Sequence, residues 1–124
     1  DNDADAFNAY VKQLHRYAEG KTTGKQVTSI QDIISTWAPK ADKNDTEGYI
    51  DRVVKLMNKD GQHVTANSNI DLNNNSQLYS LMAAMSPQEN HRSRYKSGND
   101  VRVVLENNTG GNVYASMGQL AGGQ

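Results

Sequence analysis

Apolar side chains in the first half of the chain recur every three or four residues, which is the period of an α-helix. A first stripe of such residues predicts a helix over 5–19. A second stripe over 30–37 predicts a helix that begins at Thr28, because Thr28 with Gln31 matches a capping box. Pro39 ends this helix, since the residue before a proline is disfavoured in the α region.

Two further helices are predicted in the middle of the chain. The stripe over 46–59 has no misplaced polar residue, and the Asn, Asp and Thr side chains at 44–46 mark its start. A fourth apolar stripe predicts a helix that Asn75 or Ser76 caps and that ends near 86–87. The first hundred residues are therefore expected to form a helical unit.

The period changes near the end of the chain. Apolar and polar residues alternate over 101–105 and again over 113–117, on either side of a Gly-rich turn at 107–111, which predicts a β-hairpin. An isolated hairpin is marginal in water, so this one is expected to pack on the helices or to join the sheet of a second copy in a homo-oligomer. The expected fold class is α+β, mainly α, with a helical domain over 1–100 and the hairpin and tail over 101–124.

Length and charge restrict the classes of function. The chain has 124 residues, enough for one domain, and its 13 Lys and Arg against 14 Asp and Glu give a net charge of −1. A nucleic-acid partner is not expected, because contacts with phosphates need a basic excess. No apolar run approaches the roughly 18 residues of a transmembrane helix, so no membrane span is expected.

No metal ion or cofactor is expected either. The chain has no Cys, which excludes disulfides, zinc–thiolate sites and a cysteine nucleophile. His15, His63 and His91 lie far apart and share no ligand spacing. The Asn-rich stretch over 67–73 lacks the Gly and the closing Glu of a calcium loop.

Glu89 is the candidate for acid–base chemistry. It follows the fourth apolar stripe, where a bend of the backbone is able to hold a carboxyl half-buried, and burial raises the pKa of a carboxyl, as a general acid requires. The alternative is a surface Glu that pairs with Arg92 or Arg94. The candidate ligand-binding residues beside it are Asn90, His91, Arg92 and Tyr95. For these the alternative is a solvated face.

One block of the sequence has an order of residues that can be compared with known families. Residues 28–39 end in I-I-S-T-W-A-P, and N-D-T at 44–46 and Y-I at 49–50 follow. This order resembles a pattern, I-I-x-x-W-A-P and then N-D-T and Y-I, in bacteriophage virion proteins related to lytic transglycosylases. Glu-Asn at 89–90 matches a second stretch of that pattern, which ends in H-E-N-G. The resemblance covers about residues 6–91 and implies a lysozyme-like helical fragment.

The departures from the family pattern favour a structural function over a catalytic one. The R-N-N-N-P-G-N-I-like opening of the family has no counterpart in this chain, and H-E-N-G is replaced by Q-E-N-H at 88–91. The end of the chain from Val101 resembles the hairpin that closes many phage tail and tape-measure proteins. The resemblance therefore implies a structural module of a phage or prophage tail or ejection protein, in contact with other virion subunits and acting at the bacterial cell envelope or periplasm.

Two alternatives to this structural module stay open. One is an active peptidoglycan lytic transglycosylase or muramidase that uses Glu89 as general acid and base, with peptidoglycan bound by the residues that follow it. A lytic transglycosylase needs only one essential carboxyl, since a hydroxyl of the sugar itself attacks the oxocarbenium-like centre. The other alternative is a secreted bacterial effector of similar fold.

Overall fold

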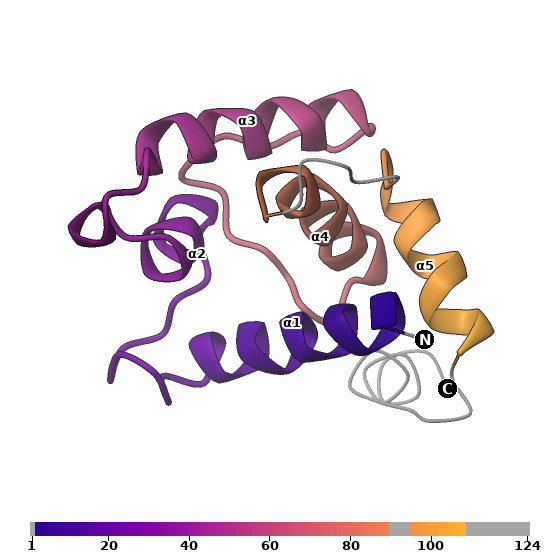
Figure 1. The fold of residues 1–124 in the computed structure, drawn as a ribbon. Helices are drawn as coiled ribbons and strands as arrows, with labels where there is room; N and C mark the ends of the chain where they lie inside the picture. The colour runs from indigo at the N-terminus through magenta and orange to yellow at the C-terminus, as the bar shows by residue number, and fades with distance from the viewer. Residues whose placement is uncertain (1, 90–94, 109–124) are drawn as a thin grey trace.

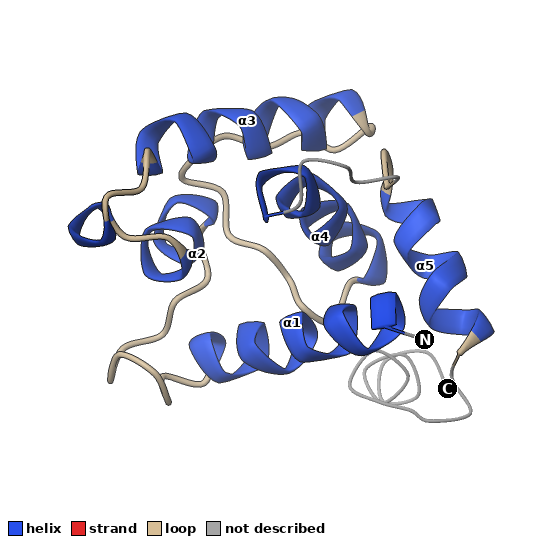
Figure 2. Ribbon diagram, viewed as in Figure 1, coloured by secondary structure: helices blue, strands red, loops and turns tan. Residues whose placement is uncertain are grey.

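The computed structural model describes residues 2–89 and 95–108, which fold as five α-helices joined by loops (Figure 1). The helices are α1 (Asn2–Ala18), α2 (Ile30–Trp37), α3 (Thr46–Lys59), α4 (Asn75–Glu89) and α5 (Gly98–Asn107), and a 3₁₀ turn, η1 (Lys40–Asp42), precedes α3. No strand is formed by the described residues, as the colouring in Figure 2 shows. The prediction of a mainly helical chain is confirmed.

α4 lies at the centre of the fold, and it packs against α1, α3 and α5 (Figure 1). Every side chain over 78–86 is buried, whichever way it points from the helix axis. A helix that is apolar all round belongs in the interior, because no face of it gains from contact with water. Its fully buried large side chains are Leu78, Leu81, Met82 and Met85.

Both ends of α4 differ from the prediction. The side chain of Asn74 caps the helix by accepting a hydrogen bond from the backbone N–H of Gln77 at 3.2 Å, one residue earlier than expected. At the other end the helix continues through Pro87 to Glu89. Pro87 has no N–H to donate to the carbonyl one turn before it, so the proline weakens the last turn without ending it.

α1, α2 and α3 supply the rest of the core through the predicted stripes. α1 starts three residues earlier than expected and buries Ala4 in addition to the stripe. α3 has the predicted bounds, and Asp45 is the residue that caps it, because its carboxylate accepts from the Gly48 N–H at 3.1 Å. Asp45 also adds negative charge at the positive end of the helix dipole.

The cap of α2 is Ser29 and not Thr28. The Ser29 hydroxyl accepts from the Asp32 N–H at 3.2 Å. Thr28 is engaged elsewhere, because its carbonyl accepts from the Ile70 N–H at 2.8 Å and its hydroxyl donates to the Asn69 side chain at 3.0 Å. A contact between segments about forty residues apart thus decides which of two adjacent hydroxyls caps the helix.

The strand predicted at 101–105 is wrong, because these residues belong to α5. Ser97 and Asp100 form a capping box at the start of this helix, each side chain bonded to the backbone of the other. Val101 and Leu105 stand four residues apart and are buried against the core, while Val103 is 42% exposed. The predicted domain boundary between 100 and 101 therefore falls inside α5. The second predicted strand, 113–117, and the tail lie outside the described residues.

Candidate functional site

The predicted site residues lie at the end of α4 and just after it. Glu89 is the last residue of α4, but its side chain lies outside the described part, as do Asn90, His91 and Arg92. Tyr95 is described and half-buried. Its ring meets the ring of Phe7 edge to face, with centroids 4.9 Å apart, and its hydroxyl donates to the carboxylate of Asp3. Tyr95 therefore fastens the start of the 95–97 segment to α1.

A groove of about 500 Å³ runs beside the second half of α4. It is bounded by the end of α3, by α4 and by the segment 95–97, and we call it the α4 groove. Its lining residues are Leu56, Lys59, Asp60, Ser80, Ala83, Ala84, Pro87, Tyr95, Lys96 and Ser97. Glu89 follows the lining residue Pro87 by two residues along α4, and Tyr95 is itself a lining residue.

Gly98, which follows the lining residue Ser97, makes a close contact with α4. A Cβ atom on Gly98 would lie 2.8 Å from the backbone N and 3.1 Å from the Cα of Ser80. The N–H of Gly98 donates to the Asp60 carboxylate at 2.8 Å. The first turn of α5 is thereby pinned to the middle of α4 and to the end of α3, and 95–97 closes the groove from the side.

A second pocket, of about 340 Å³, is lined in part by Asp60 and Gly98, which are joined by this hydrogen bond. It is lined by Asp60, Gln62, Asn75, Ser76, Tyr79, Gly98, Asn99 and Arg102. The guanidinium of Arg102 is engaged within α5, by Asn99 at 2.6 Å and by Glu106 at 2.7 Å. Burial raises the pKa of Tyr79, and the nearby Glu106 raises it further, so this phenol stays neutral.

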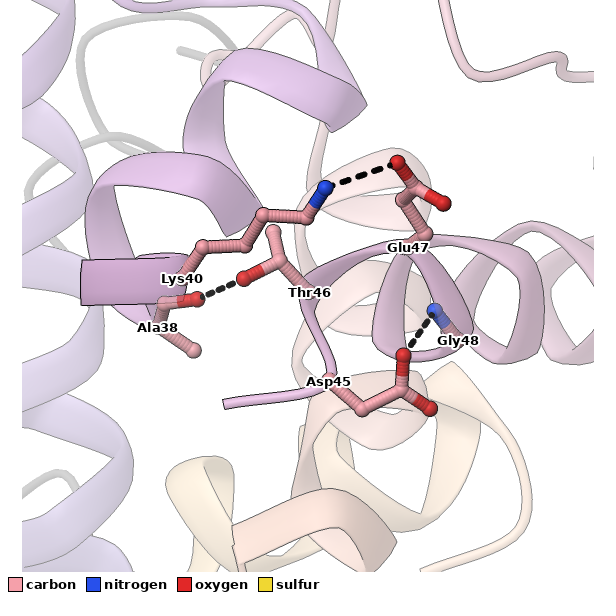
Figure 3. A network of polar contacts seen from close by, with 6 residues as sticks. All are labelled: Ala38, Lys40, Asp45, Thr46, Glu47 and Gly48. Atoms are coloured by element: carbon pink, nitrogen blue, oxygen red, sulfur yellow. Dashed lines mark hydrogen bonds and ion pairs between the residues drawn. The ribbon is translucent and has the colours of Figure 1, made fainter. Parts of the chain in front are cut away.

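The W-A-P and N-D-T block forms a joint between α2 and α3, shown in Figure 3. The hydroxyl of Thr46 donates to the Ala38 carbonyl at 2.6 Å in a buried position, and the Asn44 side chain donates to the Pro39 carbonyl at 3.1 Å. Lys40 pairs with Glu47 on the surface above them at 3.0 Å. Thr46 and Asn44 thus hold the backbone of the turn by hydrogen bonds. We call the segment 37–48 the α2–α3 joint.

Trp37 begins this joint and is half-buried. Its ring contacts Tyr10 at 4.8 Å and Tyr17 at 6.4 Å between centroids, both edge to face, so it covers α1 from the side of α2. Such pairs contribute about 0.5–1.5 kcal/mol each beyond the area that they bury. The aromatic side chain of the block therefore serves packing.

Of the predicted site residues, Tyr95 is among the described lining residues of the α4 groove, and the sequence reasoning missed the other lining residues. Ser80 carried a signal, because it is a polar residue inside the apolar run of α4. Gly98 carried another, since it follows Ser97 in the Ser-x-x-Asp spacing of a helix start. Lys59 and Asp60 look like ordinary charges at a helix end, and only the packing of α5 brings them to the groove.

The described residues supply neither a metal centre nor a membrane helix. Within the ranges 2–89 and 95–108, no three His, Asp or Glu side chains are grouped closely enough to hold a metal ion. No helix in these ranges is long and apolar enough to cross a bilayer. Comparison of the chain with family models, with curated proteins and with solved structures gave no match.

Proposed function

We propose that this chain is a lysozyme-like structural module of a bacteriophage or prophage virion, within a tail or ejection protein, and that it does not cleave peptidoglycan by itself. The observation that carries the proposal is the α2–α3 joint. The block of sequence that resembles virion proteins related to lytic transglycosylases forms this joint. The likeness is therefore a likeness of architecture.

Three polar side chains of the joint form hydrogen bonds with the backbone of the chain itself. The Thr46 hydroxyl and the Asn44 amide bond to backbone carbonyls of the turn, and the Asp45 carboxylate caps α3. A residue that acts on substrate must present its polar atoms to a cleft, and these atoms are directed at the chain itself. This supports a module that keeps the scaffold of the enzyme family.

Peptidoglycan cleavage with Glu89 as acid and base is the second candidate function. It is favoured by the position of Glu89 at the end of α4, two residues beyond a proline that lines the α4 groove. A groove of about 500 Å³ lies in the size range of binding sites for small ligands, roughly 300–1,000 Å³. The two candidates make opposite predictions about one variant.

Digestion of purified sacculi separates the two functions. Wild-type chain and Glu89→Gln are incubated with sacculi, and the released muropeptides are measured by mass spectrometry. We expect wild type and variant to release the same background amount as buffer. Abundant anhydro-sugar products that vanish in Glu89→Gln would overturn the structural proposal and establish the enzyme.

The virion itself tests the other half of the proposal. Particles released from the source bacterium after prophage induction are purified on a density gradient and digested for mass spectrometry. We expect peptides of this chain to sediment with the particles, in a fixed ratio to other tail subunits. Peptides found only in the culture supernatant, apart from particles, would contradict the virion role and support a secreted effector.

A further inference from the structure

Beyond the virion role, we propose that the α4 groove binds a small amphipathic carboxylate, with a short aliphatic body and one anionic end. The proposal rests on the lining of the groove and does not depend on Glu89 or on peptidoglycan. Three features of the lining carry it: an apolar floor, two ammonium groups with no acidic partner among the described residues, and a buried hydroxyl.

The floor of the groove is apolar and made of small side chains. Ala83 and Ala84 are buried on α4, and Leu56 and Pro87 are partly buried at either side of them. Pro87 has no N–H for the Ala83 carbonyl, but the other backbone groups of α4 bond within the helix over this stretch, so the floor offers few backbone donors and acceptors. An aliphatic chain gains from such a floor, whereas an extended peptide would find little to bond with.

Two lysines stand on the edges of the groove, Lys59 at the end of α3 and Lys96 opposite it. Within the described part of the chain neither ammonium has an acidic partner within ion-pair distance, whereas Lys21 and Lys40 are paired. Asp60, the one carboxylate among the described lining residues, accepts the N–H of Gly98 at the positive end of α5. Among these described residues the balance of charge therefore favours an anion.

Ser80 gives the third feature. Its side chain is 1% exposed, and its hydroxyl oxygen has no hydrogen-bond partner among the described residues. Buried polar atoms nearly always have a hydrogen-bond partner, because a buried atom without one has lost its hydrogen bonds to water and gained none in the protein. Ser80 is one of the lining residues, and its hydroxyl oxygen has almost no accessible surface, so a carboxylate oxygen that enters between the lysines becomes its acceptor only as the side chains around it shift.

The size of the groove favours a small molecule over a polypeptide end. A volume of about 500 Å³ accommodates a ligand of a few carbons together with its water. We therefore take hexanoate as the probe, hexanamide as its neutral counterpart, and N-acetyl-dialanine as the peptide-like carboxylate. Binding is followed on the full chain by ¹H–¹⁵N chemical shifts at neutral pH and low ionic strength.

Hexanoate is expected to shift the amides of Ser80, Ala83, Ala84 and Lys96, and to bind about tenfold tighter than hexanamide. Lys59→Met and Lys96→Met are each expected to weaken hexanoate about threefold to fivefold, the effect of one exposed charge pair. Lys55→Met is the control, because Lys55 is exposed on the same helix as Lys59 but does not line the groove. Raised salt should reduce the difference between hexanoate and hexanamide.

Ser80→Ala separates a binding role from a structural one. The variant is expected to unfold at the same or a higher urea concentration, because it removes an unpaired buried hydroxyl, and to bind hexanoate about fivefold more weakly. Equal binding of hexanoate and hexanamide, shifts outside the groove, or unchanged affinity in both lysine variants would overturn the proposal. Tighter binding of N-acetyl-dialanine than of hexanoate would also overturn it and assign the groove to a peptide end.

Discussion

Gly98→Ala tests the contact that fixes α5 against α4. The added methyl group would lie 2.8 Å from the backbone N and 3.1 Å from the Cα of Ser80, whereas non-bonded carbon atoms settle at about 3.5–4.0 Å. Backbone atoms in the middle of a buried helix cannot turn aside as a side chain can. The first turn of α5 therefore has to move away by roughly half an ångström or more.

This movement should cost stability in three places. It separates the Gly98 N–H from the Asp60 carboxylate, now at 2.8 Å, and it loosens the packing of Val101 and Leu105. Overpacking of this kind costs about 1–3 kcal/mol. Ala is a better helix former than Gly by about 1 kcal/mol, which acts in the opposite direction. Once the weakened hydrogen bond between Gly98 and Asp60 is added, the expected net loss is about 1–2 kcal/mol of unfolding free energy.

Urea unfolding followed by Trp37 fluorescence and by far-UV circular dichroism measures this loss. Gly48→Ala is the matched control, because the methyl group there meets the ends of the exposed Asp45 and Arg52 side chains. The ends of these two exposed side chains are able to rotate away from the added methyl group. The higher helix propensity of Ala offsets any loss of the Asp45 cap, so the change in unfolding free energy should stay within about 1 kcal/mol. A Gly98→Ala protein as stable as wild type, or more stable, would refute the close contact, because only the gain in propensity would remain.

Two further changes test the α2–α3 joint and α1. Thr46→Val keeps the shape of the side chain but removes the buried hydrogen bond to the Ala38 carbonyl, and it should lower the free energy of unfolding in urea by about 1–2 kcal/mol. Thr36→Val is the control, because it loses a hydrogen bond within one turn of its own helix and should cost clearly less. Equal costs in the two variants would contradict the role of the α2–α3 joint. Burial lowers the pKa of His15 below 6.5, although Glu19 opposes this, so the folded chain binds fewer protons than the unfolded chain and loses stability as pH falls through 6.5. His15→Gln should therefore flatten the fall in melting temperature below that pH, and a slope equal to that of the wild-type chain would contradict this.

α3 shows what the sequence determined by itself. Its bounds follow from a stripe of apolar residues, a capping side chain at Asp45 and a glycine beyond its end, all within one stretch of chain. Such signals act between residues three or four apart, so they do not depend on contacts with distant parts of the chain. The same local logic predicted α1 and α2, with errors of one to three residues at their starts.

α5 shows where a local pattern is ambiguous. Val101, Val103 and Leu105 alternate as in a strand, but the first and last of them also stand four residues apart, as on one face of a helix. The capping box of Ser97 and Asp100 favoured the helix, and the buried side of α4 gave that face a partner. Short apolar runs carry both periods at once, so packing makes the choice.

The α4 groove was decided by tertiary structure alone. Its lining comes from three segments, 56–60, 80–87 and 95–97, and the sequence contains no spacing that joins them. The sequence drew attention to Glu89 and Tyr95 because they come at or after the end of an apolar stripe, but it gave no sign that Lys59, Ser80 and Lys96 line one groove. Contacts within a helix depend on neighbours along the chain, whereas a groove depends on how separate helices pack, and here the missing Cβ of Gly98 lets α5 approach α4 closely.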